Sequence, residues 1–245
     1  MLTCVSLNSM KPAGKKKIFT LAMLSIFVMT VSTAKAQDNR FFAGVSSGIT
    51  FPMGQFAKTD FYAGGYALTG FHVSAEGGWY LRPNIALTAG FSQQFYRYYK
   101  NAYLIDLVNS DNFISHVEMK TDMYQVRCYL LGALYRYPLT DRLSLSGKLS
   151  GGLLWAQTPD QFIGADYYLV GSLYYRKTPA TSLKPASLAG LDVNYSLFDH
   201  VVIRLSGTFS YSKADFTFVK TDGSEYTRNY TMPLSTAGCG INITF

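Results

Sequence analysis

Charged residues, histidines and long apolar segments are all scarce in this chain of 245 residues. Asp, Glu, Lys and Arg make up 15% of the residues, and there are three histidines. After the N-terminal region, no apolar run is long enough to form a membrane-spanning helix. Aromatic and small residues are abundant, with 19 Tyr, 17 Phe and 21 Gly. Many aromatics, few charges and no helical span together predict β structure with a large apolar surface.

The first 36 residues have the pattern of a cleaved signal peptide. A basic segment at residues 15–17 precedes an apolar run at residues 18–31, and Ala34-Lys35-Ala36 matches the small-residue cleavage pattern. We expect cleavage after Ala36, so that the mature domain comprises residues 37–245. An uncleaved N-terminal anchor is the alternative.

Most of the excess positive charge belongs to this predicted signal. Residues 1–36 hold five lysines and no acidic residue, so the formal net charge falls from +7 to +2 when they are removed. The remaining positive charge is too small to indicate binding to nucleic acid, and we expect no nucleic-acid partner. The sequence leaves both Met1 and Met10 open as the start of translation.

The three cysteines do not define a disulfide framework. Cys4 precedes the apolar run, which argues against a lipoprotein. Cys128 and Cys239 fall in separate predicted strands, where two small apolar residues fit better than a disulfide. No His, Cys and Asp spacing matches a metal-ligand set, and no glycine pattern opens a helix after a strand. We therefore expect no metal and no nucleotide cofactor.

Turn-forming residues divide the mature chain into eight apolar segments. Tight breaks at residues 82–84, 138–142 and 199–200 alternate with long polar or tyrosine-rich connections at residues 51–66, 100–118, 157–183 and 220–230. The predicted strands are residues 41–50, 67–81, 85–99, 119–137, 143–156, 184–198, 201–219 and 231–245. Most are longer than soluble strands and long enough for a tilted bilayer crossing.

The predicted strands alternate between an apolar face and a face of small polar residues. In the segment 143–156, for example, leucines and a tryptophan alternate with serines and glycines. A soluble sandwich would carry bulky charges on its polar face, whereas here the charges are isolated. We predict a lumen polar network formed by His72, Glu76, Lys148, Asp192 and Arg204. Buried charges are expected to pair, because an unpaired buried charge is costly.

Aromatic residues are predicted to form two girdles at the membrane interfaces. Beside the tight turns lie Trp79, Tyr80, Tyr135, Tyr137 and Phe198. Towards the long connections lie Tyr96, Tyr98, Tyr99, Trp155, Tyr211 and Phe216. The segment 119–137 is apolar on both faces, so its register stays open.

These features resemble the small outer-membrane β-barrels of the OmpA and OmpX type. The resemblance rests on the signal pattern, the eight segments, the alternating short and long connections, and the final segment from Ser235 to Phe245. The glycine-rich strands and Tyr/Asp-rich loops are most similar to the PorT-like outer-membrane β-barrel domain family. The resemblance implies an all-β, eight-stranded, antiparallel up-and-down transmembrane barrel in the bacterial outer membrane of a Gram-negative envelope.

The same resemblance implies a role for the end of the chain. In such barrels the last strand, with its C-terminal aromatic residue, is recognised by the barrel-assembly machinery. Ile241, Ile243 and Phe245 are the corresponding residues here. The alternative for Phe245 is a simple girdle aromatic. By the same resemblance the tight turns face the periplasm and the long connections face the cell exterior.

An enzymatic function is disfavoured by the few available bases. His72, Ser74 and Glu76 share one strand face, but that face points into the predicted lumen, where a hydrogen-bond and salt-bridge network fits better. Exposed side chains of mixed chemical character are found in the loops. The candidate binding surface consists of Tyr98, Tyr99, Tyr103, Tyr167, Tyr168, Tyr174, Tyr175 and Arg176. Tyrosine and arginine are enriched at binding surfaces, although extended girdles have the same composition.

We therefore predict an envelope protein with a side-chain-filled lumen and a structural or surface-binding role. Its expected partners are outer-membrane lipid, the assembly machinery during biogenesis, and a surface ligand or envelope protein. An accessory role in protein export or envelope assembly, implied by the PorT-like resemblance, is the alternative. A lipid- or peptide-cleaving enzyme and a narrow channel are disfavoured further.

Overall fold

The computed structural model describes residues 40–219 and 224–245, which form eleven strands and two short helices. The predicted signal peptide lies outside the described residues. The strands are β1 (Phe41–Pro52), β2 (Ala67–Arg82), β3 (Ile85–Tyr98), β4 (Ile114–Thr121), β5 (Tyr124–Pro138), β6 (Leu143–Gln157), β7 (Gln161–Tyr167), β8 (Gly171–Lys177), β9 (Thr181–Phe198), β10 (Val201–Val219) and β11 (Glu225–Thr244). The helices are α2 (Gly54–Ala57) and α3 (Lys100–Ser110).

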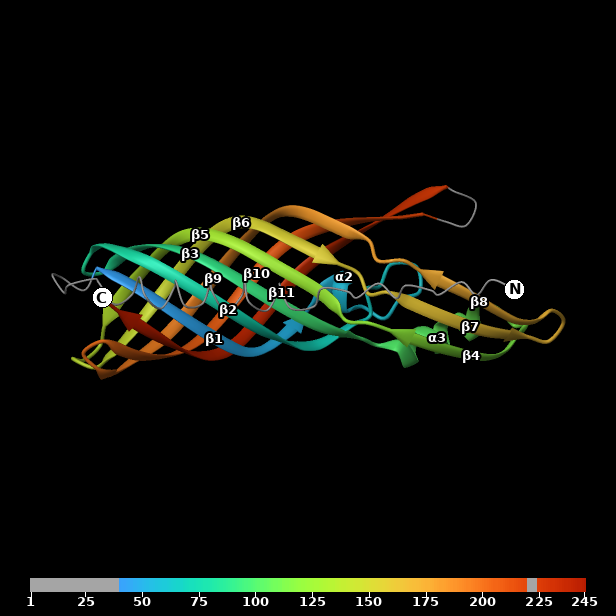
Figure 1. Ribbon diagram of the computed structural model, residues 1–245, viewed down its shortest axis with the longest axis horizontal. Coiled ribbons are helices and arrows are strands. Elements are labelled where there is room, and N and C mark those ends of the chain that lie inside the picture. Colours follow the sequence, from blue (N-terminus) through green and yellow to red (C-terminus); the bar gives the residue numbers. More distant parts are fainter. Residues whose placement is uncertain (1–39, 220–223) are drawn as a thin grey trace, which may run out of the picture. The chain divides into compact units, whose positions relative to one another are not determined.

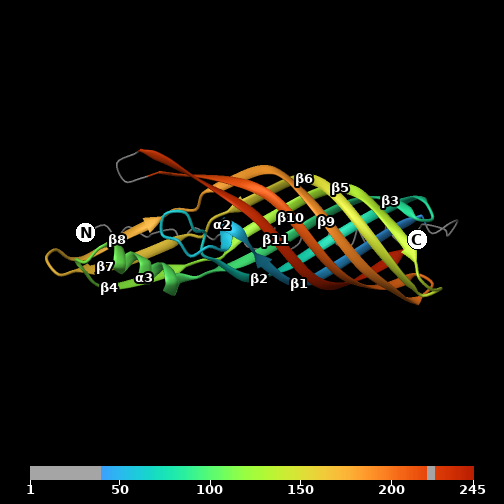
Figure 2. The same ribbon diagram turned by 180° about the vertical axis from the view of Figure 1, so that it is seen from behind.

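Eight of the strands close into a barrel. Their order around the ring is β1-β11-β10-β9-β6-β5-β3-β2, and every neighbouring pair is antiparallel. Figures 1 and 2 show the tilted strands wrapping around the barrel from opposite sides. The predicted eight-stranded antiparallel barrel is therefore confirmed.

The first and last strands form the closing seam of the barrel. β1 pairs with β11 along nearly its whole length, and Gly48 stands opposite Gly238. A Cβ atom added to Gly48 would lie 2.1 Å from the carbonyl oxygen of Ala237. The glycines at this seam are required because the two backbones leave no room for a side chain.

The outer surface of the barrel is an apolar belt. Each barrel strand contributes exposed apolar side chains, among them Val45, Val73, Leu87, Leu131, Leu149, Leu191, Leu205 and Ile241. Exposing such a continuous apolar surface to water would cost free energy, whereas the hydrocarbon of a bilayer matches it. The barrel is thus of the transmembrane type.

The described helices do not cross the membrane. Neither α2 nor α3 combines the length and apolar character that a membrane-spanning helix needs.

Only part of the predicted girdles lies on the outside. Trp79, Tyr135, Tyr137 and Phe198 are exposed near the short turns, and Trp79 stacks on Phe41 at a centroid distance of 6.1 Å. The assignments of four further aromatics to the girdles are wrong.

The four misassigned aromatics all point inward. Tyr96 and Phe216 are fully buried in the lumen, and Tyr80 packs on Phe42 at 5.4 Å inside the barrel. Tyr98 packs on Tyr124 of the inner core at 6.0 Å. All four have even residue numbers in strands whose even-numbered residues face inward. The distance from a turn predicts where along the strand an aromatic residue lies. Whether its side chain faces the lumen or the lipid depends on the alternation of side chains along the strand.

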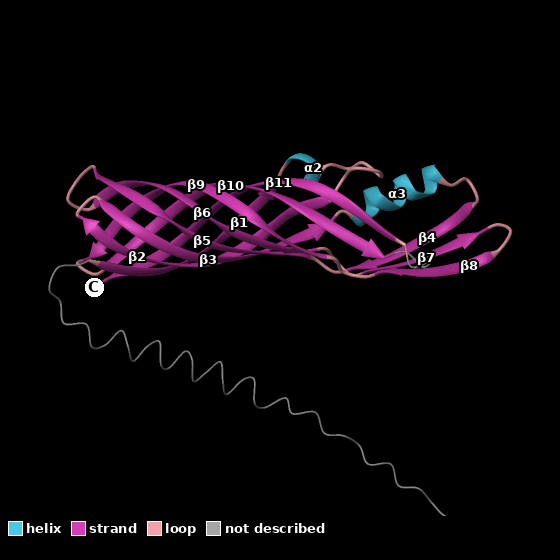
Figure 3. Cartoon of the chain, turned by 90° about the horizontal axis from the view of Figure 1, so that it is seen from above, coloured by secondary structure: helices cyan, strands magenta, loops and turns pink. Residues whose placement is uncertain are grey.

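Beyond the barrel, the connections predicted as loops contain a second sheet. β4, β7 and β8 form a three-stranded antiparallel sheet in the order β4-β7-β8, with α3 beside β4 (Figure 3). The hairpin of β10 and β11 also continues past the end of β9, to the pair Val219–Glu225. We call the sheet and α3 the extension.

The predicted strand 119–137 is wrong in its extent, because it joins parts of two sheets. β4 ends at Thr121 in the extension, and β5 starts at Tyr124 in the barrel. The register left open by the sequence is settled by burial: Val126, Cys128 and Leu134 face the lumen. Both faces of β5 are apolar because its lumen face belongs to a hydrophobic core.

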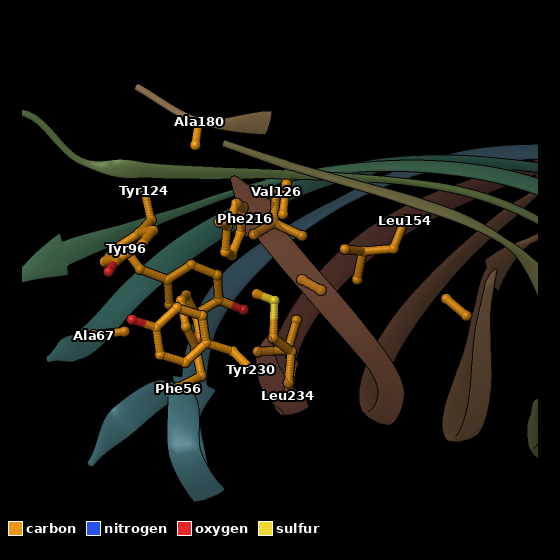
Figure 4. Packing of buried hydrophobic residues seen from close by; sticks show 14 of the residues in the cluster. Phe56, Ala67, Tyr96, Tyr124, Val126, Leu154, Ala180, Phe216, Tyr230 and Leu234 are labelled. Atoms are coloured by element: carbon orange, nitrogen blue, oxygen red, sulfur yellow. The ribbon is translucent and has the colours of Figure 1, made fainter. Parts of the chain in front are cut away.

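This core fills the lumen at the end from which the extension rises. It comprises buried residues of seven barrel strands together with Phe56 of α2. Figure 4 shows Phe56 between Tyr96, Tyr124 and Tyr230, with Val126, Leu154, Phe216 and Leu234 further along the lumen. The rings of Tyr96 and Tyr124 meet Phe56 edge-on at 5.3 and 4.9 Å. The lumen is therefore sealed at this end by packed side chains.

Candidate functional site

Four charged side chains from four different strands meet in the middle of the barrel. Glu76 Oε2 accepts hydrogen bonds from Lys148 Nζ at 2.8 Å and from Arg204 Nη1 at 2.9 Å. Asp192 Oδ2 lies 3.9 Å from each of the same two nitrogens. The four side chains are 1% to 11% exposed, and their formal charges cancel. Removing one of them would leave an uncompensated buried charge.

Two small cavities flank this charge cluster. One of about 60 Å³ is lined by Glu76, His72 and several serines, and the other, of about 20 Å³, is lined by Asp192, Arg204 and Asn242. The larger volume holds only a few water molecules. Polar atoms such as His72 Nδ1 and Asp192 Oδ1 are buried without a protein partner, which suits groups that hydrogen-bond to internal water.

The five residues predicted for the lumen network all lie inside the barrel. Glu76, Lys148, Asp192 and Arg204 are in mutual contact, and His72 lines the adjoining cavity. Their pairing could not be read from the sequence, because it depends on how the strands are staggered around the ring.

The strand face that carries His72, Ser74 and Glu76 has the geometry of a network. Ser74 Oγ lies 2.6 Å from Ser46 Oγ, and the Glu76 carboxylate is engaged by two cations. A nucleophile needs a base within hydrogen-bonding reach, but Ser74 Oγ contacts another serine and the Glu76 carboxylate is held by two cations. This arrangement supports an internal structural role for the face.

The eight residues predicted as a loop binding surface separate into two groups. Tyr98 and Tyr103 pack with Tyr66 at the barrel mouth, at centroid distances of 5.8 and 5.4 Å. Tyr66 donates a hydrogen bond to Asp106, and burial together with this carboxylate raises the pKa of Tyr66 well above its usual value. Tyr99 begins the connection into α3 and is exposed. These packing and hydrogen-bonding contacts stabilise the barrel mouth.

The second group lies on the extension, on the hairpin of β7 and β8. Tyr168, Tyr174 and Tyr175 are exposed, and Tyr167 is half-buried. Arg176 donates two hydrogen bonds to Asp160, and these bonds lower the pKa of that carboxyl group below its usual value.

The hairpin tip also exposes residues that sequence reasoning missed. Leu169 and Val170 are 82% and 72% exposed, beside Tyr168 at 73%. We call these three residues the tip. The sequence does contain a short apolar run at this position, inside a connection that is otherwise polar. The run is exposed only because the chain turns there.

The predicted assembly residues lie on the last strand. Ile241 and Ile243 are exposed on the outer face of β11, and Phe245 directly follows the strand and is half-buried. Cys239 shares this face, whereas Cys128 faces the lumen; both cysteines are free.

No group of three or more His, Cys, Asp or Glu side chains in residues 40–219 and 224–245 is arranged to hold a metal ion. The charge cluster of the lumen is instead neutralised by its own two cations.

The strand pairing and the apolar belt define the protein as an eight-stranded antiparallel transmembrane β-barrel. No protein-family model matches the chain, and no curated protein sequence is significantly similar to it. Solved structures with a similar fold include Neisserial surface protein A, which is 11% identical with a TM-score of 0.44 over 86% of this chain and 100% of that chain. Others are a major outer membrane protein of Thermus thermophilus and OprG of Pseudomonas aeruginosa. The former is 11% identical, with a TM-score of 0.49 over 84% of this chain and 99% of that chain. OprG is 9% identical, with a TM-score of 0.42 over 83% of this chain and 95% of that chain.

Proposed function

We propose that this protein is a bacterial outer-membrane barrel that binds a partner at the cell surface through its extension. The observation that carries the proposal is the tip, where Tyr168, Leu169 and Val170 are all more than 70% exposed on the hairpin of β7 and β8. Contiguous exposed apolar side chains mark interaction surfaces. The sealed lumen supports a structural and binding role over that of a general pore.

The outer-membrane location rests on physical features of the barrel. A closed barrel leaves no unpaired strand edge in the hydrocarbon, and the belt of exposed apolar side chains matches that environment. The short turns follow β2, β5 and β9, whereas the extension rises from the opposite end. We assign the extension to the outside of the cell, in keeping with the longer extracellular loops of such barrels.

An accessory role in protein export or envelope assembly is the second candidate. It would require contacts on the periplasmic side, and the turn between β5 and β6 offers one exposed apolar residue, Leu139. The tip is larger and more apolar, so it is the better docking surface.

Site-specific photo-crosslinking in intact cells separates the two candidates. A photoreactive residue at Leu169 is expected to capture a partner protein, whereas one at Leu139 is not, because the apolar contact surface lies at the tip. Crosslinks at Leu139 alone would contradict surface binding and favour the export role.

A matched variant makes this test independent of barrel assembly. The amide of Thr158 donates a hydrogen bond of 2.9 Å to the carbonyl of Ala180, so residues 159–179 can be replaced by Asn-Gly, a two-residue hairpin turn. This variant is expected to keep heat-modifiable migration in gels and to lose the partner. Retention of the partner at the wild-type level would contradict binding through the extension.

A further inference from the structure

The extension carries a groove where α3 meets the three-stranded sheet. The groove has a volume of about 590 Å³, and residues of α3, β4, β7 and β8 line it. The opposite face of the sheet holds Met119, Ile163 and Ala165, which are at most 6% exposed. The volume falls in the range of small-molecule sites, about 300–1,000 Å³. We call this hollow the extension groove.

A glycine forms the floor of the extension groove. Glu118 of β4, Gly164 of β7 and Tyr174 of β8 stand directly opposite one another across the sheet, so they share one face. Because Gly164 has no side chain, the space between Glu118 and Tyr174 stays open. A Cβ atom added to Gly164 would lie 2.9 Å from Cε1 of Tyr174. The ring of Tyr174 therefore leans over the glycine.

Two exposed aromatic rings form a flat surface in the extension groove. Phe162 and Tyr174 stack with a centroid distance of 6.0 Å and an interplanar angle of 18°. Their side chains are 47% and 69% exposed, so much of this surface is open to a ligand. The face of an aromatic ring carries partial negative charge and attracts the weakly positive C–H groups of a ligand. We call Phe162 and Tyr174 the platform.

Polar side chains of both hydrogen-bonding types line the groove beside the platform. Lys100 and Lys120 supply donors, Glu118 supplies acceptors, and the amide of Asn101 supplies both. A hydroxyl group donates one hydrogen bond and accepts others, so a ligand with several hydroxyl groups can use all of these side chains. The mixed charges match a polyhydroxylated ligand better than a purely anionic or purely cationic one.

We propose that the extension groove binds a saccharide, one ring of which stacks on the platform. A pyranose ring combines a flat side of C–H groups with a rim of hydroxyl groups, which matches the platform and the polar side chains beside it. The inference goes beyond the proposed function, which concerns a partner at the tip. The groove is a separate site on the same extension.

The experiment is saturation-transfer difference NMR on the refolded full-length barrel in phosphatidylcholine nanodiscs, with empty nanodiscs as the background. The probes are chitotetraose, lactose, sialyllactose and a hyaluronan tetrasaccharide, which cover neutral and acidic rings. We expect saturable binding of at least one saccharide, with the strongest saturation on the C–H protons of one ring. L-Tryptophan tests the alternative occupant, a planar aromatic molecule.

Variants of the platform show whether binding depends on its rings. Tyr174→Ala and Phe162→Ala are each expected to weaken binding about three- to tenfold, and Tyr174→Phe, which keeps the ring, should recover most of the loss. Gly164→Ala is also expected to weaken binding, because the added Cβ displaces the Tyr174 ring. Tyr62→Ala is the matched control, because Tyr62 is 81% exposed and lies outside the groove; we expect a change of less than about twofold.

Two results would overturn the site. One is the absence of saturable binding for all four saccharides, whether or not tryptophan binds, and the other is an unchanged affinity in both Tyr174→Ala and Phe162→Ala. Heat-modifiable migration of each variant shows that the barrel is intact. Partner capture at Leu169 without saccharide binding would leave the proposed function standing while the saccharide site falls.

Discussion

Replacing Glu76 by Gln is expected to lower the free energy of unfolding by about 3–5 kcal/mol, the usual effect of breaking a buried ion pair. Glu76 bridges Lys148 and Arg204 through one oxygen, and Asp192 lies 3.9 Å from both cations. The substitution preserves shape but turns a neutral cluster into one with a net positive charge. The adjoining cavity holds too little water to solvate that charge fully.

Equilibrium unfolding by urea in lipid vesicles measures this effect, with the fluorescence of Trp79 and Trp155 as the signal. Glu118→Gln is the matched control, because Glu118 is exposed on β4; we expect a change within about 0.5 kcal/mol. Adding Lys148→Met to Glu76→Gln restores neutrality and should recover part of the loss. A loss below about 1 kcal/mol for Glu76→Gln would contradict a tightly coupled cluster.

Replacing Gly48 by Ala is expected to destabilise the closed barrel by more than about 3 kcal/mol, beyond the common range for overpacking. The added Cβ would lie 2.1 Å from the carbonyl oxygen of Ala237 and 2.4 Å from the Cα atom of Gly238. Both atoms belong to backbone, which cannot move aside without breaking the pairing of β1 with β11. The two strands must then separate locally at the seam.

The matched control is Gly207→Ala on the outer face of β10, where the nearest neighbouring atom would be 4.0 Å away. Both variants add one methyl group to a barrel strand, but only the one at Gly48 would meet backbone atoms closer than 3 Å. Heat-modifiable migration after refolding measures the closed fraction. Equal closed fractions for the two variants would show that the seam is looser than described.

The barrel was predictable because its signals are local. Alternation such as Ser144, Leu145 and Ser146 identifies a strand with one polar face, and a tight break such as residues 82–84 identifies a turn. These signals place the barrel strands to within a few residues, except at the segment 119–137 and at the start of β11. That strand begins at Glu225, inside the connection predicted at residues 220–230.

The extension was not predictable from the same signals. β4 and β5 are separated by two residues, Asp122 and Met123, which are too few to be recognised as a boundary between sheets. β8 has every side chain except Lys177 exposed, so it carries no apolar alternation that a pattern could detect. Its pairing with β7 is decided by backbone hydrogen bonds.

The presence of a polar network in the lumen could be predicted from the sequence, but the contacts between its side chains could not. Isolated charges on small polar faces predict a buried network, yet contact of Glu76 with Arg204 depends on the stagger of strands distant in sequence. The hydrophobic core at the mouth was missed because it depends on Phe56, which enters from a connection. Only the closed fold shows that Val126 and Leu234 share one interior with it.

The most direct measurement of the closed barrel is a disulfide across its seam. Ser47 stands opposite the native Cys239 in the pairing of β1 with β11, and both side chains are exposed on the outer face. Directly opposite Cβ atoms lie about 4.5–5.5 Å apart, close to the reach of a disulfide, whereas diagonal neighbours are farther apart. Ser47→Cys is therefore expected to form a bond to Cys239 on mild oxidation, detected by mass spectrometry of the linked peptides. Ile49→Cys, which stands opposite Ala237, should not form this bond. No linkage in Ser47→Cys, or equal linkage in both variants, would contradict the closed barrel.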